Sequence, residues 1–162
     1  MNEINWKEWF TIFASFLIAA ILTILPLPEW AVWFRPAWLP LVLIYWLLAI
    51  PYRVGFGLAF AVGIVLDGLT GTLLGEHSFA LLIIAFIVIK FYRQIRVFPL
   101  WQQAFATAIL LFIYHLLLIA IAGFAGEPAN ARFMMLSVTT SMLLWPWLAL
   151  VMRDLHRRFR IH

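Results

Sequence analysis

The sequence predicts an all-α membrane protein whose helices form a six-helix transmembrane bundle. Of its 162 residues, 66% are hydrophobic and 11% charged, whereas a soluble domain has about 25% charged residues. The mean hydropathy is +1.03, and apolar runs long enough to cross a hydrocarbon core about 30 Å thick recur along the chain. A soluble globular protein is therefore excluded. The 15 Phe, 9 Trp and 4 Tyr exclude a disordered chain.

Six spans are predicted, and together they make a single integral membrane domain over residues 1–162. The first span ends where Pro26 and Pro28 interrupt a helix, because proline lacks a backbone donor. The second has a short apolar core and depends on Trp38, Trp46 and other aromatic residues to reach the membrane interfaces. The six predicted spans are residues 9–25, 36–52, 54–74, 78–92, 100–123 and 133–152.

Each of the last four predicted spans is distinguished by a particular residue or by its length. The third contains Asp67, and the fourth is extended by Lys90, whose ammonium can reach the headgroups. The fifth is the longest, and the sixth contains Pro146, where a kink is expected. Between the first two spans, residues 26–38 are rich in tryptophan, which is typical of an aromatic belt in the headgroup layer.

The distribution of Lys and Arg predicts the orientation of the spans. Basic residues accumulate in the cytoplasmic loops of membrane proteins. With a cytoplasmic N-terminus, the outer side carries only Arg35 and Arg132. The inner side then carries nine basic residues, which are Lys7, Arg53, Lys90, Arg93, Arg96, Arg153, Arg157, Arg158 and Arg160. Both termini are therefore expected in the cytoplasm, and the net charge of +4 is attributed to topology, with no nucleic acid partner.

The predicted third span carries an acidic residue within a repeat of small residues. An ionised carboxylate at mid-bilayer costs at least about 2.5 kcal/mol, so Asp67 must face protein or water. Positions four apart share one face of a helix, and small residues there allow close helix contact. We therefore expect a helix-packing or partner interface, although Asp67 capping a helix that breaks nearby remains an alternative. The face comprises Ala59, Gly63, Asp67, Gly71 and Gly75.

The remaining polar residues do not form a catalytic motif. His115 is the only other titratable candidate for a proton relay, and a histidine hydrogen-bonded within the bundle is the favoured interpretation. Hydroxyl groups at residues 137–141 are expected to bond to carbonyls of the preceding turn or to bridge helices. The sequence has no cysteine, and it lacks the motifs of zinc, phosphate-binding and serine hydrolase sites. No catalytic, cofactor or metal site is predicted.

Several arginines are expected to form a basic cytoplasmic surface. Such segments bind anionic lipid headgroups at about 1 kcal/mol per charge. Contact with an acidic cytoplasmic partner is the alternative. The residues are Arg93, Arg96, Arg153, Arg157, Arg158 and Arg160.

Five stretches, in order and spacing, resemble the rod shape-determining protein MreD family of the bacterial inner membrane. They are residues 34–46 (FRPAWLPLVLIYW), 49–55 (AIPYRVG), 63–75 around Asp67, 100–104 (LWQQA) and 144–148 (LWPWL). The resemblance covers nearly the whole chain. A departure occurs at Tyr114 and His115, where an acidic residue is expected in relatives.

The resemblance implies a non-enzymatic member of the complex that builds the lateral cell wall. Proteins similar to this one pair with MreC, a single-span periplasmic protein. They link the actin-like filament MreB to the glycan polymerase RodA and to penicillin-binding protein 2. The family also resembles the six-helix substrate-binding subunits of energy-coupling-factor transporters, and association of two copies is left open.

Two functions compete at this point. A membrane scaffold acts through helix packing and loop contacts. A small-molecule binding or transport subunit instead needs convergent polar groups in a cavity, for which the spans offer Asp67, Thr70, Thr72 and His115 with the hydroxyls of the last span. An enzyme acting on lipid-linked precursors is a distant third.

Overall fold

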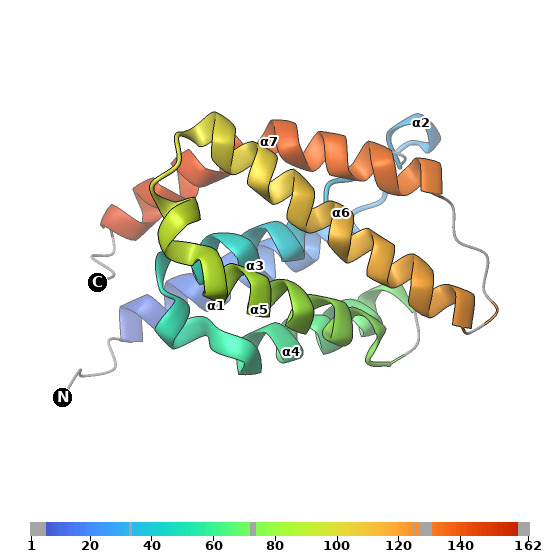
Figure 1. The fold of residues 1–162 in the computed structure, drawn as a ribbon, viewed down its shortest axis with the longest axis horizontal. Helices are drawn as coiled ribbons and strands as arrows, with labels where there is room; N and C mark the ends of the chain where they lie inside the picture. Colours follow the sequence, from blue (N-terminus) through green and yellow to red (C-terminus); the bar gives the residue numbers. More distant parts are fainter. Residues whose placement is uncertain (1–5, 33, 72–73, 125, 127–130, 159–162) are drawn as a thin grey trace.

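A computed structural model describes residues 6–32, 34–71, 74–124, 126 and 131–158, without the side chains of residues 32, 52, 53 and 131–133. The described part of the chain is all helical and contains no strand (Figure 1). The six described helices other than the short Glu29–Val32 helix overlap the six predicted spans one to one, which confirms the predicted fold class. The helices are α1 Trp6–Ile24, the short α2 Glu29–Val32, α3 Trp38–Ala49, α4 Pro51–Thr70, α5 Glu76–Arg96, α6 Leu100–Phe124 and α7 Ala131–Arg158.

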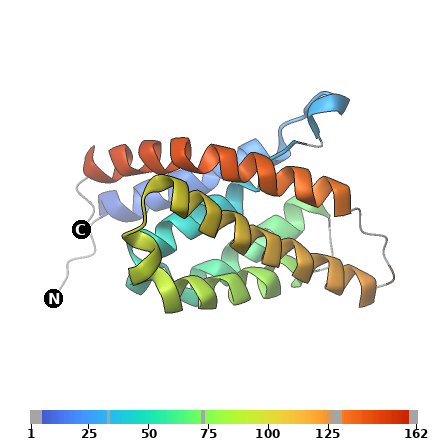
Figure 2. The same cartoon turned by 45° about the horizontal axis from the view of Figure 1, so that its top comes forward.

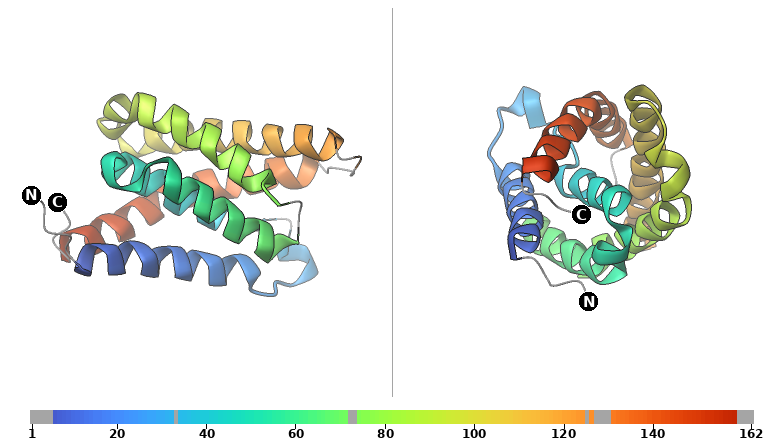
Figure 3. Two further views of the ribbon diagram at one scale, coloured as in Figure 1. Left: turned by 90° about the horizontal axis from the view of Figure 1, so that it is seen from below. Right: turned by 90° about the vertical axis from the view of Figure 1, so that its left-hand side faces the viewer.

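Helix α3 is the central helix of the bundle. Nine of its twelve residues are buried, and it packs against α1, α4, α5, α6 and α7. The end-on view in Figure 3 shows α3 with the other long helices around it. A helix that is apolar on all sides is stable only when neighbours cover every side. The continuous apolar run from Leu39 to Leu48 therefore places α3 in the core.

The burial of α3 corrects one expectation about its aromatic residues. Trp46 is fully buried, and its indole Nε1 donates a hydrogen bond to Ser15 Oγ on α1 at 2.8 Å. Trp46 is therefore a core residue and does not extend the span to a membrane interface. At about 1.5 Å per residue, α3 is only about 18 Å long. Backbone groups at both ends of this short helix bond to other helices, since the N–H of Ala37 donates to Ser141 Oγ and Arg96 donates to the carbonyls of Leu48 and Ala49.

Helices α4 and α5 form an antiparallel pair beside α3. Helix α4 begins with Pro51, a favoured residue in the first helical turn, and is interrupted at Gly55, which has φ 52° and ψ −170°. It ends at Thr70, four residues before the predicted end of the third span. Gly71 follows with φ 70° and terminates the helix in the left-handed conformation that glycine adopts without a steric cost.

Helices α6 and α7 form the second long pair of the bundle, and they pack against each other (Figure 2). Helix α7 continues through Pro146 and extends six residues past the predicted end of the sixth span, to Arg158. Among the described residues, four helical segments are long and apolar enough to cross a membrane: Trp6–Ile24, Glu76–Arg96, Leu100–Phe124 and Met134–Arg158. Trp38–Ala49 and Val54–Thr70 are shorter apolar helices.

The two ends of the bundle differ in what they display. The start of α1 and the end of α7 lie at the same end (Figures 1 and 3), where α3 and α5 also end and α6 begins. At the opposite end, the turn from α4 to α5 lies close to the segment around Arg35, and the short α2 projects from the bundle (Figure 2). We call these the terminal end and the turn end.

Candidate functional site

Asp67 lies at the turn end of the bundle and caps the helix that follows its own. Its carboxylate is buried, with the residue 1% exposed. Oδ2 accepts a hydrogen bond from the backbone N–H of Gly75 at 2.7 Å. Oδ1 accepts one from the backbone N–H of His77 at 2.9 Å and one from His77 Nδ1 at 2.6 Å. The first turn of a helix has unpaired N–H groups and a positive dipole, both of which a carboxylate stabilises.

The alternative in which Asp67 caps a helix that breaks near Gly68 is not found in that form. Asp67 caps the N-terminus of α5 across the turn and does not end a helix at Gly68, because α4 continues to Thr70. His77 is a residue that sequence reasoning missed. No local pattern identifies it, because Asp67 and His77 are ten positions apart and meet only across the turn between α4 and α5.

Two aromatic residues of α6 lie beside this cluster. The ring centroid of Tyr114 is 6.2 Å from that of His77 and 5.1 Å from that of His115. His115 Nδ1 donates a hydrogen bond to the carbonyl of Leu111 in its own helix at 2.8 Å. This bond agrees with the favoured interpretation of His115 as a histidine hydrogen-bonded within the bundle.

A small cavity of about 190 Å³ opens beside the Asp67 cluster, and we call it the outer pocket. Ligand pockets for small molecules usually enclose about 300–1,000 Å³, so the outer pocket is small for a solute. Thr72, which sequence reasoning offered as a polar group for a solute, lies outside the described residues. Polar residues lining the outer pocket include Arg35, Thr70, His77, His115 and Ser137.

The small residues of α4 do not make one continuous contact. A Cβ atom added to Gly63 would lie 2.3 Å from Ser78 Cα, so α4 and α5 approach each other at this position as only glycine allows. Ser78 Oγ also donates to the carbonyl of Phe60 at 3.1 Å. Ala59, one turn before Gly63, is fully buried.

Gly71 and Gly75 need a correction. A Cβ atom at either position would meet no described atom within 4 Å, so neither glycine lies in a tight contact with the described part of the chain. Their φ angles are 70° and 95°, and glycine is required there for the turn between α4 and α5. The small residues at every fourth position therefore serve two purposes, a close helix contact at Gly63 and a turn at Gly71 and Gly75. Their regular spacing in the sequence does not distinguish the two.

The hydroxyl groups of α7 follow both expected patterns. Thr139 and Thr140 bond to carbonyls four residues earlier. Ser137 Oγ donates to the carbonyl of Arg35 at 2.9 Å, and Ser141 Oγ accepts from the N–H of Ala37 at 3.1 Å. The two serines of α7 therefore hold the segment before α3 against α7.

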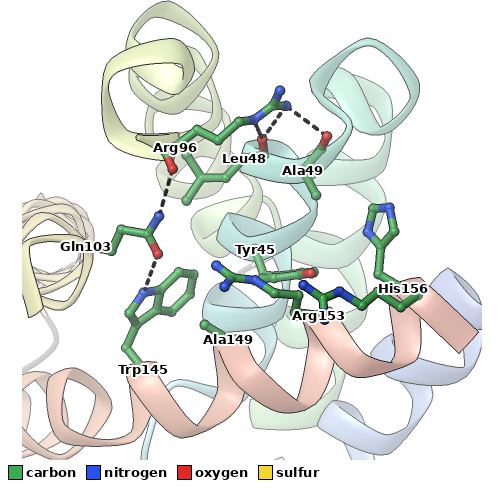
Figure 4. A pocket seen from close by; sticks show the side chains of 10 residues that line it. Tyr45, Leu48, Ala49, Arg96, Gln103, Trp145, Ala149, Arg153 and His156 are labelled. Carbon is green, nitrogen blue, oxygen red and sulfur yellow. Dashed lines mark hydrogen bonds between the residues drawn. The ribbon is translucent and has the colours of Figure 1, made fainter. Parts of the chain in front are cut away.

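A larger cavity of about 350 Å³ lies at the terminal end, between α3, α5, α6 and α7 (Figure 4). We call it the basic pocket, because its charged lining residues are all cationic. On one side the side chain of Arg96 extends from α5, and on the other Arg153 and His156 extend from α7 (Figure 4). Its lining residues also include Tyr45, Gln103, Trp145 and Arg157.

The arginines of the predicted basic surface therefore fall into two groups. Arg96, Arg153 and Arg157 line the basic pocket. Arg93 lies outside the pocket, with its guanidinium over the ring of Tyr92, and Arg158 forms an exposed ion pair with Asp154 at 3.0 Å. Arg160 lies outside the described residues. Sequence reasoning grouped these arginines by compartment and did not detect the pocket.

The chain offers few groups for metal binding. In the described ranges, no three His, Asp or Glu side chains lie close enough together to hold a metal ion. The polar groups of the turn end are instead used in hydrogen bonds between helix ends, as at Asp67 and His77.

Two comparisons of the sequence with known proteins give the same family. The family model described as rod shape-determining protein MreD matches residues 4–155. The chain is 37% identical over 156 residues to a protein of Haemophilus influenzae named rod shape-determining protein MreD, and the match covers 96% of each chain. No solved structure matches the chain, so the resemblance to energy-coupling-factor subunits stays a prediction. With its apolar helices and a match over nearly its whole length, this membrane protein belongs to the rod shape-determining MreD family, whose role is in rod cell shape.

Proposed function

We propose that this protein is a non-enzymatic scaffold of the bacterial inner membrane that organises lateral peptidoglycan synthesis and binds MreC. The observation that carries the proposal is the family match over residues 4–155. The same complex is proposed to include MreB, RodA and penicillin-binding protein 2. In this view the protein acts through helix packing in lipid and through contacts at its two ends.

The polar groups at the turn end support a structural role for this part of the molecule. A proton or solute pathway needs groups that can exchange partners in a cavity. The Asp67 carboxylate instead accepts three hydrogen bonds from the first turn of α5 and its cap. His115 bonds to its own helix. These bonds favour helix fixation over transport.

We propose that the single transmembrane helix of MreC docks at an apolar groove of the bundle. It has a volume of about 270 Å³ and is lined by residues of α1, α3 and α7. In lipid, helices associate through close packing, because the hydrophobic effect gives no advantage there. A concave apolar groove that accepts side chains of a partner helix meets this requirement. The groove includes Ile18, Leu22, Val42, Trp147 and Val151.

The proposal is tested by co-purification with MreC in mild detergent, using two matched variants. Ile18 lies in the groove and is 58% exposed, whereas Ile109 on α6 lies outside it and is 61% exposed. Ile18→Trp fills the groove, so the recovery of MreC is expected to fall. Ile109→Trp adds the same bulk on another face, so both MreC recovery and rod shape are expected to persist.

Different results of this experiment would contradict the proposed docking site and the proposed scaffold role. If both variants recover MreC as well as the wild type does, the groove is not the docking site. If the wild type itself recovers no MreC but brings a bound solute or an ATPase module, the scaffold role is wrong. That second result would favour the transport subunit.

A further inference from the structure

The basic pocket concentrates positive charge without an acidic residue in its lining. Three arginines and one histidine from α5 and α7 line a cavity of about 350 Å³. Cavities lined by charges of one sign focus the electrostatic field and attract the opposite charge. The other lining side chains, among them Tyr45 and Gln103, are neutral. The pocket is therefore suited to an anion.

The structure holds Arg96 in place at one side of the pocket. Its Nε and Nη2 donate to the carbonyl of Leu48 at 2.9 and 2.7 Å, and Nη2 also donates to the carbonyl of Ala49 at 2.8 Å. These carbonyls belong to the last turn of α3, where backbone acceptors lack partners within the helix. Arg96 Nη1 takes part in none of these bonds. A guanidinium oriented in this way needs little reorganisation to bind an anion.

Arg153, at the other side, has its charge available. Among the described residues, Arg153 and Arg157 form no hydrogen bond or ion pair. Arg158, on the same helix, is in contrast paired with Asp154. Arginine donors bind the oxygen atoms of phosphate groups in a geometry that favours two hydrogen bonds. Two guanidinium groups facing one cavity fit a phosphate group better than a single-atom anion.

The aromatic residues at the terminal end indicate the depth of the pocket. Trp6 begins α1, Trp101 is the second residue of α6, and Tyr92 lies in the last turns of α5. Both tryptophans are exposed on the surface of the bundle. Tryptophan and tyrosine collect at the level of the lipid headgroups. The pocket at this end is therefore in reach of headgroup phosphates, which are abundant there.

We propose that the basic pocket binds the phosphate of an anionic phospholipid headgroup between Arg96 and Arg153. Basic pockets between membrane helices are a known form of lipid recognition. This site differs from a diffuse basic surface, since it depends on particular arginines and not on the sum of the positive charge. It does not rest on the proposed scaffold role.

The test measures lipid binding to the purified, delipidated full-length protein in neutral detergent by native mass spectrometry. The probes are phosphatidylglycerol and the zwitterionic phosphatidylcholine. We expect phosphatidylglycerol to bind more tightly, and Arg153→Gln to weaken its binding by about tenfold, as loss of a charge-assisted hydrogen bond predicts. The matched control Arg158→Gln removes the same charge from the same helix outside the pocket. The affinity of the Arg158→Gln variant for phosphatidylglycerol should remain within about twofold of the wild type, because exposed charges are screened.

Further measurements make the outcome decisive. The thermal unfolding of each variant in detergent shows whether the fold is intact, and Arg157→Gln, also in the pocket, provides a second variant if Arg153→Gln fails to fold. Equal binding of the two lipids overturns the proposal, as does an equal effect of Arg153→Gln and Arg158→Gln. Inorganic phosphate or glycerol phosphate is added as a competitor. If either binds as tightly as the lipid does, the site is for a free anion and not for a headgroup. If an acidic peptide binds more tightly than the lipid and displaces it, the proposal is also overturned.

Discussion

The carboxylate of Asp67, near the end of α4, accepts hydrogen bonds from both the backbone and the imidazole of His77 at the start of α5. A buried carboxylate in a membrane protein is unfavourable by at least about 2.5 kcal/mol. Three donors and the positive end of the α5 dipole offset this cost. Asp67 therefore fixes the turn that joins the two helices, and it does so with its charge buried inside the protein.

The first prediction concerns substitutions of Asp67. Asp67→Leu removes the carboxylate that accepts hydrogen bonds from Gly75 and His77. It is expected to reduce the free energy of unfolding by about 3–5 kcal/mol. Asp67→Asn keeps one acceptor oxygen, so its free energy of unfolding is expected to fall by only about 1–3 kcal/mol. Thermal unfolding in detergent measures this order, and complementation of rod shape in a strain lacking the protein shows its effect on function.

One result would contradict this structural role for Asp67. Both variants could reach normal membrane levels with nearly wild-type unfolding temperatures, yet both fail completely to restore rod shape. The ionised carboxylate would then be needed for the function itself. Transport would become the better explanation.

The second prediction compares two glycines of α4. Gly63→Ala places a methyl group against the backbone of Ser78, so α4 and α5 must separate. A loss of about 3 kcal/mol is expected, at the upper end of typical overpacking costs. Gly57→Ala is the matched control on the same helix, because its Cβ meets no described atom within 4 Å. Alanine favours helix by about 0.5–1 kcal/mol over glycine, so this variant should be slightly more stable.

Chemical or thermal unfolding of the two variants under identical detergent conditions decides the comparison. Equal stability of Gly63→Ala and Gly57→Ala would show that α4 and α5 are not in close contact at residue 63.

The third prediction concerns the turn glycine Gly71. Its positive φ disfavours residues that have a Cβ atom by about 1–2 kcal/mol. Gly71→Ala should cost this amount, whereas Gly71→Asn should cost less, because asparagine tolerates the left-handed conformation. If alanine and asparagine are equally harmful, crowding against a partner, and not backbone conformation, determines the choice of glycine.

Local sequence patterns were sufficient for the long helices but not for their surroundings. The apolar runs predicted six helices, and four of the described helical segments have the length and hydrophobicity of a membrane span. The position of α3 at the centre was not predicted, although nearly every residue from Leu39 to Leu48 is apolar. In lipid an exposed helix and a buried helix are both apolar, so the usual contrast between a polar and an apolar face is weak. Trp46 was placed at an interface for this reason.

The candidate sites show the same limit. The small residues around Asp67 predicted that it faces protein, because their spacing is local. The partner His77 is ten residues away across a turn, and only the turn geometry brings the two together. Arg96 and Arg153 are 57 positions apart and line one pocket through the packing of α5 and α7 around α3. No periodicity in the sequence indicates that Arg96 and Arg153 lie at the same pocket.

The last prediction concerns the orientation of the protein in the membrane. The start of α1 and the end of α7 lie at one end of the bundle (Figure 3). The basic pocket is lined by residues of the helix ends found there. If the bundle spans the membrane along its length, these two helix ends are expected on the same side, and the excess of Lys and Arg there predicts that this side is cytoplasmic. A fluorescent reporter fused after residue 162 should be bright, and alkaline phosphatase at the same position should be inactive. Alkaline phosphatase inserted in the predicted outer loop at residues 125–130 should be active and provides the matched control. An active phosphatase after residue 162 would reverse the orientation. It would also move the basic pocket to the outer leaflet, where the positive-inside rule gives no reason for it.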